Sequence, residues 1–183
     1  MTGIGESSYR RDRAVDMLAL EQLVYTYSDA LVRYAYCYVG SADVAEEVTE
    51  DAFAALFVKN KHFETVQQAR AWLYKAVRSR AVDYLRLHRR HVPLEDVQEV
   101  LSVPGPVEEF IVKERNDAIY RCMQALPQQY RVVLQLQYFD EFDIAQIGKI
   151  LGKTKKQVYN LLSRAKAALK ELLVKEGITS EDL

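Results

Sequence analysis

The chain has 183 residues, of which 49% are hydrophobic and 28% are charged, a globular composition that excludes a wholly disordered protein. This length provides for one large domain or two small ones. Seven glycines and four prolines are too few for the closely spaced turns of a β-sandwich or β-barrel, so we predict an all-α fold.

Charge is distributed unevenly along the chain, although the formal net charge is only −1. Residues 70–91 contain seven Lys or Arg and one acid, and residues 149–170 contain seven more and no acid. Acidic residues dominate residues 43–51 and 95–117. Two basic segments separated by acidic ones predict contacts with nucleic acid at two places and with protein elsewhere.

Cysteine usage and hydropathy predict where the protein works. Cys37 and Cys122 form no CxxC pair, so we expect two buried thiols in a reducing compartment. No apolar run approaches the roughly 18 residues of a membrane helix. The polar first residues lack the apolar core of a signal peptide. We therefore expect a cytoplasmic protein without membrane insertion.

The first elements in chain order predict a three-helix domain over residues 14–91. Residues 1–13 are expected to form a flexible tail, and apolar residues at helical spacing predict helices over 14–39, 43–58 and 65–90. The second and third of these helices begin at capping boxes, in which an Asp or Thr is followed three positions later by Glu or Gln: Asp43 with Glu46 and Thr65 with Gln68.

A linker and a second domain of four helices follow. Residues 92–107 hold three of the four prolines and predict a linker. The second domain is expected over residues 108–177, with Pro127 at the start of its second helix. The four predicted helices cover residues 108–125, 127–139, 143–152 and 154–176. Asp143 with Gln146 and Thr154 with Gln157 form two more capping boxes.

Residues 143–169 predict a helix-turn-helix, because a short helix and a longer one are joined by a turn that contains Gly152. In the longer helix one face is apolar and is expected to be buried: Val158, Leu161, Leu162, Ala165, Leu169 and Leu172. The opposite face is expected to read DNA bases: Lys155, Lys156, Tyr159, Asn160, Ser163 and Lys166. Arg164 and Lys170 are better placed for phosphates. A solvated basic face on an ordinary bundle helix is the alternative.

The predicted third helix offers a second nucleic-acid face, because cations that track phosphates interleave there with aromatic residues that stack on unpaired bases. The cations and their polar neighbour fall within roughly 120° of the helix circumference: Lys75, Arg78, Ser79, Arg86, Arg89 and Arg90. Phe63 lies in the preceding loop. The alternative is that Trp72, Val77 and Tyr84 form core and the arginines are only solvated, and for Trp72 we expect core.

These segments, in this order, resemble the extracytoplasmic-function (ECF) group of RNA polymerase sigma factors over about residues 17–173. The resemblance is carried by DVAEEVTEDAF, AWLYKAVRSRAVDYLRLHRR, LPQQYRVVLQL and the helix-turn-helix. It implies partners: core RNA polymerase, promoter DNA and an anti-sigma factor. It implies no cofactor, no metal and no catalytic residue. It also implies that the first domain melts the minus-ten promoter element and that the second reads the minus-thirty-five element.

The resemblance also assigns residues. Docking on core polymerase would fall to five acids: Asp43, Glu46, Glu47, Glu50 and Asp51. The melted minus-ten strand would be held by Phe63, Arg78, Ser79, Asp83 and Arg86. Leu126 to Leu136 would contact the polymerase flap. The chain departs from the family where Asn is common at Ser79, Gln-Glu at Glu50-Asp51, Lys at Tyr159 and Arg at Leu161, so the promoter sequence cannot be carried over.

Three other functions compete with this interpretation. An enzyme with a carboxylate metal site needs Glu-x-x-His motifs, and none of His62, His88 and His91 follows a Glu at that spacing. A free-standing helix-turn-helix regulator is usually a symmetric dimer, whereas this chain has no obvious dimerisation segment and carries an additional basic, aromatic helix. A sigma-like chain that serves another scaffold would not need the acidic docking helix.

Overall fold

The computed structural model describes residues 5–58, 63–89 and 117–178, and every regular element among them is helical. The first domain contains α1 (Gly5–Val39), α2 (Ala42–Val58) and α3 (Val66–Arg89). The second contains α5 (Asp117–Gln124), α6 (Gln128–Leu134), the π-helix η2 (Gln135–Phe139), α7 (Ile144–Leu151) and α8 (Lys155–Lys175). The predicted linker and most of the helix from Glu108 lie outside the described residues.

Each domain buries one face of each main helix. In the first domain α1, α2 and α3 all pack against one another, and Leu31, Tyr34, Phe53, Leu73 and Val77 fill the centre. In the second domain α6, α7 and α5 pack on α8. On α8 the predicted apolar face is confirmed, since Val158, Leu162 and Ala165 are buried and Leu161, Leu169 and Leu172 are partly buried.

The predicted starts of α7 and α8 agree with the structure. Pro127 is the N-cap residue of α6 rather than its first helical residue, and the start expected at Glu108 lies outside the described residues. The first domain differs more. The helix expected from Ala14 begins at Gly5, within the segment for which we expected a tail. No proline or internal glycine separates the two positions, so a helix that tertiary contacts hold can propagate backwards through polar residues at little cost. Asp43 does not cap α2, because the helix begins at Ala42 and Ser41 accepts the first backbone bond from Ala45. Asp43 lies in the first turn instead.

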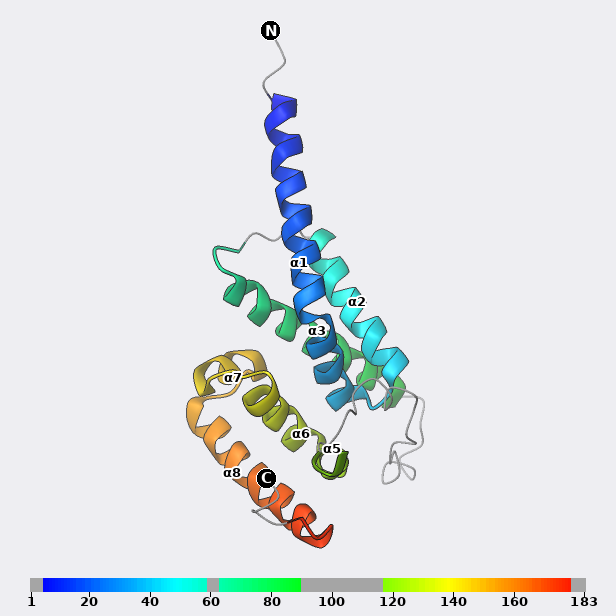
Figure 1. The fold of residues 1–183 in the computed structure, drawn as a ribbon, viewed down its shortest axis with the longest axis vertical. Coiled ribbons are helices and arrows are strands. Elements are labelled where there is room, and N and C mark those ends of the chain that lie inside the picture. Colours follow the sequence, from blue (N-terminus) through cyan, green and yellow to red (C-terminus); the bar gives the residue numbers. More distant parts are fainter. Residues whose placement is uncertain (1–4, 59–62, 90–116, 179–183) are drawn as a thin grey trace.

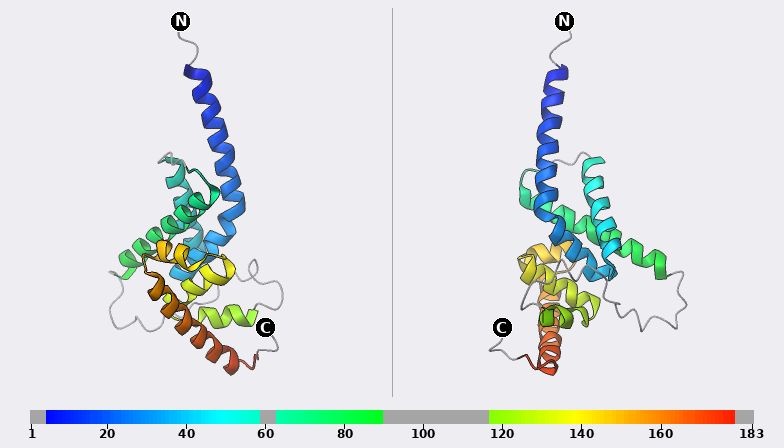
Figure 2. Two further views of the ribbon diagram at one scale, coloured as in Figure 1. Left: turned by 90° about the vertical axis from the view of Figure 1, so that its left-hand side faces the viewer. Right: turned by 45° about the vertical axis from the view of Figure 1, so that its right-hand side comes forward.

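The two domains lie directly against each other. Figures 1 and 2 show α7 of the second domain beside α3, and α6 beside the end of α1. Buried residues of both domains form one continuous hydrophobic cluster. The second-domain helices are therefore placed against the first domain rather than held apart from it.

Candidate nucleic-acid and polymerase interfaces

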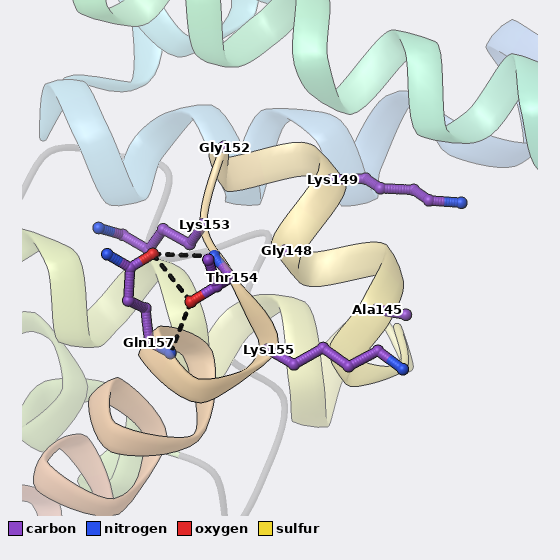
Figure 3. A pocket seen from close by; sticks show the side chains of 8 residues that line it. All are labelled: Ala145, Gly148, Lys149, Gly152, Lys153, Thr154, Lys155 and Gln157. Carbon is purple, nitrogen blue, oxygen red and sulfur yellow. Dashed lines mark hydrogen bonds between the residues drawn. The ribbon is translucent and has the colours of Figure 1, made fainter.

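The helix-turn-helix is defined by two reciprocal capping boxes. Asp143 accepts the Gln146 backbone N–H at 2.8 Å, and its own N–H donates to the Gln146 side chain at 2.9 Å. Thr154 and Gln157 repeat this arrangement at the start of α8, with distances of 3.3 and 2.8 Å (Figure 3). Both boxes satisfy backbone donors that a helix start leaves unpaired. The predicted caps of α7 and α8 are confirmed.

The turn between α7 and α8 depends on two glycines. Gly152 has a φ of 67° and ends α7 in the left-handed conformation that glycine adopts without strain. Gly148 has no such φ, but a Cβ there would lie 2.7 Å from the Lys153 carbonyl oxygen. The backbone of the turn therefore passes over Gly148 at a distance that admits no side chain.

We expect Gly148→Ala to destabilise the second domain by about 1–3 kcal/mol, because the added methyl group forces a packed backbone apart. Urea unfolding followed by circular dichroism measures the change. Ala167→Ser, at an exposed position of α8, is the control and should stay within about 0.5 kcal/mol of the parent chain. Equal stability of the Gly148 variant and the control would contradict the close approach.

The outer face of α8 presents the side chains predicted to read DNA. All seven predicted α8 positions are exposed: Lys155, Lys156, Tyr159, Asn160, Ser163, Arg164 and Lys166. Lys166 differs from the others because its ammonium lies 5.3 Å from the ring centroid of Tyr138 on η2, a cation–π distance. The remaining side chains project from the first turns of α8, the end that a recognition helix places in the major groove.

Two further lysines, one on α7 and one in the turn, add to this surface. The sequence pattern predicted no specific role for either. Lys149 of α7 and Lys153 of the turn line a shallow groove together with Lys155, Thr154 and Gln157. In Figure 3 Lys149 and Lys155 extend toward the same side of the turn, and Lys153 extends toward the other. The basic composition of residues 149–170 was the available signal, but only the folded turn brings these cations next to the α8 face.

On α3 the predicted nucleic-acid residues separate into two groups. Lys75, Ser79, Asp83 and Arg86 are exposed, and Arg86 forms an ion pair with Asp83 at 3.4 Å. An exposed pair of this kind contributes at most about 1 kcal/mol and leaves Arg86 available. Arg78 is instead half-buried. Arg78 acts on Tyr38 of α1: burial raises the pKa of Tyr38 to about 12, and the positive charge of Arg78 opposes that rise.

The aromatic residues near the start of α3 pack together. Phe63 and Trp72 are both partly buried, with ring centroids 6.1 Å apart. Trp72 packs against the core, as the sequence predicts. Thr65 caps α3 by accepting the Gln68 N–H at 3.2 Å, but the Gln68 side chain accepts from Glu64 rather than from Thr65. Residues 59–62 of the preceding loop lie outside the described part of the chain.

The acidic face of α2 is fully presented to solvent. All five predicted docking acids are exposed: Asp43, Glu46, Glu47, Glu50 and Asp51. They fall within roughly 140° of the helix circumference at 100° per residue. Ala45, Val48 and Ala52 on the opposite side are buried. Such a one-sided negative face fits a basic protein surface.

Cys37 and Cys122 are buried and form no disulfide. Burial raises the pKa of Cys37 to about 12 and also raises that of Cys122. Both thiols are therefore protonated at neutral pH, in agreement with the expectation of buried thiols.

Among the described residues, no three His, Cys, Asp or Glu side chains group as metal ligands, and no helix is long and apolar enough to span a membrane.

Family models match both domains. The model for Sigma-70 region 2 matches residues 23–91, and the model for Sigma-70 region 4 matches residues 116–169. The two matches fall on the two packed domains and cover the acidic helix, the basic helix and the helix-turn-helix. The chain belongs to the ECF group of RNA polymerase sigma factors. It is a sigma factor that directs promoter recognition.

This sigma factor is similar to known members over most of its length. It is 25% identical over 171 residues to the ECF RNA polymerase sigma factor SigW of Bacillus subtilis, with 86% of this chain and 90% of SigW covered. In fold it is similar to the sigma factor RpoE of Bartonella quintana, which was solved with the anti-sigma factor NepR. The TM-score is 0.68 at 22% identity, and the match covers 84% of this chain and 95% of RpoE. CnrH, solved with the cytosolic domain of CnrY, gives a TM-score of 0.59 at 20% identity, with 87% and 90% covered.

Proposed function

We propose that the sigma factor divides its work between three surfaces described above. The acidic face of α2, centred on Glu47 and Asp51, docks on a basic surface of core RNA polymerase. The exposed face of α3 holds the melted minus-ten strand, with Phe63 in the loop before it. The outer face of α8 reads the minus-thirty-five element in duplex DNA. The single observation that carries this proposal is that two basic helix faces, one in each domain, are exposed together with the acidic face.

Each surface suits the chemistry of its partner. Cations such as Lys75 and Arg86 pair with phosphates, and nearby aromatic rings stack on bases that have left the duplex, at about 1–3 kcal/mol per base. On α8, Asn160 can pair with adenine through two hydrogen bonds, and Lys155 and Lys156 can reach guanine. Arg164 and Lys149 suit phosphates, which position the helix without specifying sequence. RNA synthesis itself falls to the polymerase, so the sigma factor needs no catalytic residue of its own.

The expected partners follow from the family and its neighbours. RpoE and CnrH were each solved in complex with another protein, the anti-sigma factor NepR and the cytosolic domain of CnrY. We extend this to an anti-sigma partner for the present chain. Because core polymerase and promoter DNA lie in the bacterial cytoplasm, we place the working protein there.

Transcription in vitro tests the proposal directly. Core polymerase with the purified chain, over a library of genomic templates, is expected to start RNA at a defined set of sites that core alone does not use. A chain that neither joins core polymerase nor redirects these starts would overturn the proposal. Specific binding of the isolated chain to duplex operators, without any effect of core polymerase, would favour a free-standing regulator.

A further inference from the structure

The contact between the two domains has two polar anchors, and the first lies at the end of α1. A helix leaves its last carbonyl groups without partners inside the helix. Here the Arg131 guanidinium of α6 donates to the Cys37 carbonyl at 3.3 and 3.4 Å, and Gln128 donates to the Tyr38 carbonyl at 3.0 Å. Arg131 also binds the carbonyl groups of Gln124 and Leu126 in its own domain. A positive charge at a helix C-terminus is favourable, so the second domain caps the first.

The second anchor is Arg70 at the start of α3. Its guanidinium donates to the backbone carbonyl of Asp140 and lies 4.0 Å from the ring centroid of Phe142. The Phe142 ring meets Tyr74 of α3 edge-on, with centroids 4.8 Å apart. Phe142, Tyr74 and Asp140 are almost fully buried, with 2%, 0% and 3% of their surfaces exposed. Arg70 thus sits between the domains, stacked on one ring and bonded to the chain beside it.

Unusual backbone brings these residues of the second domain to α3. The π-helix η2 ends with the Asp140 N–H bonded to Gln135, and the Phe142 N–H bonds to Leu136. Glu141 between them has a φ of 53°, a left-handed conformation that is strained for a non-glycine residue. π-helical turns and strained residues concentrate at functional positions. Together they direct Asp140 and Phe142 out of the second domain toward Arg70.

In the closed arrangement the two DNA-reading surfaces lie too close together to reach both promoter elements. The minus-ten and minus-thirty-five elements are about 25 base pairs apart, or roughly 85 Å at 3.4 Å per pair. α3 is roughly 36 Å long and α7 roughly 12 Å at 1.5 Å per residue, and helices are about 10 Å wide. Because α7 packs on α3 and leads directly into α8, the two reading surfaces are at most roughly 60 Å apart. Closure also covers Gln128 and Arg131 of α6, the helix expected to meet the polymerase flap.

We propose that Arg70, seated on Phe142 and bonded to the Asp140 carbonyl, is a latch that holds the free chain closed and that opens when core polymerase separates the domains. The role in polymerase binding rests on the proposed function, whereas the closure of the free chain does not. Among the described residues the closed state leaves Arg70 Nε buried without a hydrogen-bond partner. An unpaired buried polar group is costly, so it lowers the net stability of the closed contact.

Small-angle scattering of the full chain tests closure without polymerase. Arg70→Ala, and Arg70→Ala combined with Gln128→Ala, are expected to raise the radius of gyration by several ångströms while circular dichroism keeps the helical signal. Arg80→Ala is the matched control, because Arg80 lies on the same helix and donates within it, to the Ala76 carbonyl. Variants as compact as the parent chain would overturn the latch.

The affinity for core polymerase distinguishes a failure of the latch proposal from a failure of the proposed function. A chain that must open before it binds has its apparent affinity lowered by the fraction that is open. Arg70→Ala should therefore bind core polymerase several-fold more tightly than the parent or the Arg80→Ala control. Open variants that bind core no better would overturn the regulatory role of the latch. Failure of every chain, the parent included, to bind core would instead overturn the proposed function and leave closure standing.

The latch should also respond to pH through Asp140. In the closed state burial raises the pKa of this carboxyl to about 6, against the lowering effects of Tyr74 and Arg70 on α3, Gln135 on η2 and Arg33 on α1. An open chain returns the carboxyl to water and to its ordinary pKa of about 3.9. The closed state then binds the proton more tightly, so closure strengthens as the pH falls through 6.

This linkage can be measured where closure is already weakened. In Gln128→Ala, the ratio of closed to open chain should rise about four-fold between pH 7.5 and pH 5.5, as read from scattering. Asp140→Asn in the same background should abolish the change, because the amide does not titrate. A pH response that survives this substitution would show that another group controls closure.

Discussion

Reversal of Glu47 and Asp51 to lysine should weaken binding to core polymerase by about 30-fold, equivalent to roughly 2 kcal/mol. Both carboxylates are exposed on the acidic face of α2. Each reversal replaces an attraction for a basic surface by a repulsion. The association rate should fall most at low salt, because screening weakens long-range attraction at higher ionic strength. Titration of labelled core polymerase at two salt concentrations measures the effect.

A matched variant separates docking from net charge. Glu171→Lys with Glu176→Lys makes the same change in total charge at two exposed positions near the end of α8. This control should bind core within about two-fold of the parent chain, because its charges lie on a different domain from the docking face and are screened beyond about 10 Å. Equal losses in both double variants would show that total charge governs binding, and the α2 docking face would then be rejected.

Local patterns in the sequence are sufficient for most of the helices. The caps at Asp143 and Thr154 depend on side chains three residues apart, and the buried face of α8 depends on apolar spacing within one helix. Both are short-range properties, which is why they can be predicted without tertiary information. The exposed positions of the acidic α2 face follow from the same periodicity.

The start of α1 and the π-helix η2 could not be predicted in this way. Polar residues before Ala14 carry no apolar period, so nothing local distinguishes a tail from the extension of a helix that is held elsewhere. Residues 135–139 differ from an ordinary helix only in their hydrogen-bond pattern. Their role becomes visible once Asp140 and Phe142 are seen against α3.

Arg70 shows most clearly what could not be predicted from the sequence alone. In the sequence it is the first cation of a basic segment and is grouped with residues that suit nucleic acid. In the structure it is half-buried and contacts a segment 70 positions away in the chain. Arg131, in the segment expected to contact the polymerase flap, likewise donates to a distant group, the carbonyl of Cys37, 94 positions away. Composition can indicate that a segment is basic, but long-range packing decides which of its cations remain available for DNA.

Replacement of Asn160 and Tyr159 by alanine should reduce preference for the minus-thirty-five element by about five- to 150-fold. Asn160 offers paired hydrogen bonds to one adenine, and a good bidentate contact contributes about 1–3 kcal/mol of discrimination. Tyr159 is 60% exposed and can reach a thymine methyl group or a phosphate. Transcription from promoters with matched and altered minus-thirty-five sequences measures the preference, while binding to core polymerase should stay at the parent level.

Lys170→Ala provides the contrast that makes this test specific. Lys170 is exposed on α8 and suits a phosphate, so its loss should lower binding to every sequence uniformly and reduce the salt dependence by about one counterion. Asn160 and Tyr159 should instead change the ranking of promoters. Because the base-reading side chains and the polymerase-docking acids lie on different domains, promoter choice and core binding should respond to separate substitutions. An unchanged promoter ranking in the double variant would show that another face of the helix-turn-helix reads the DNA.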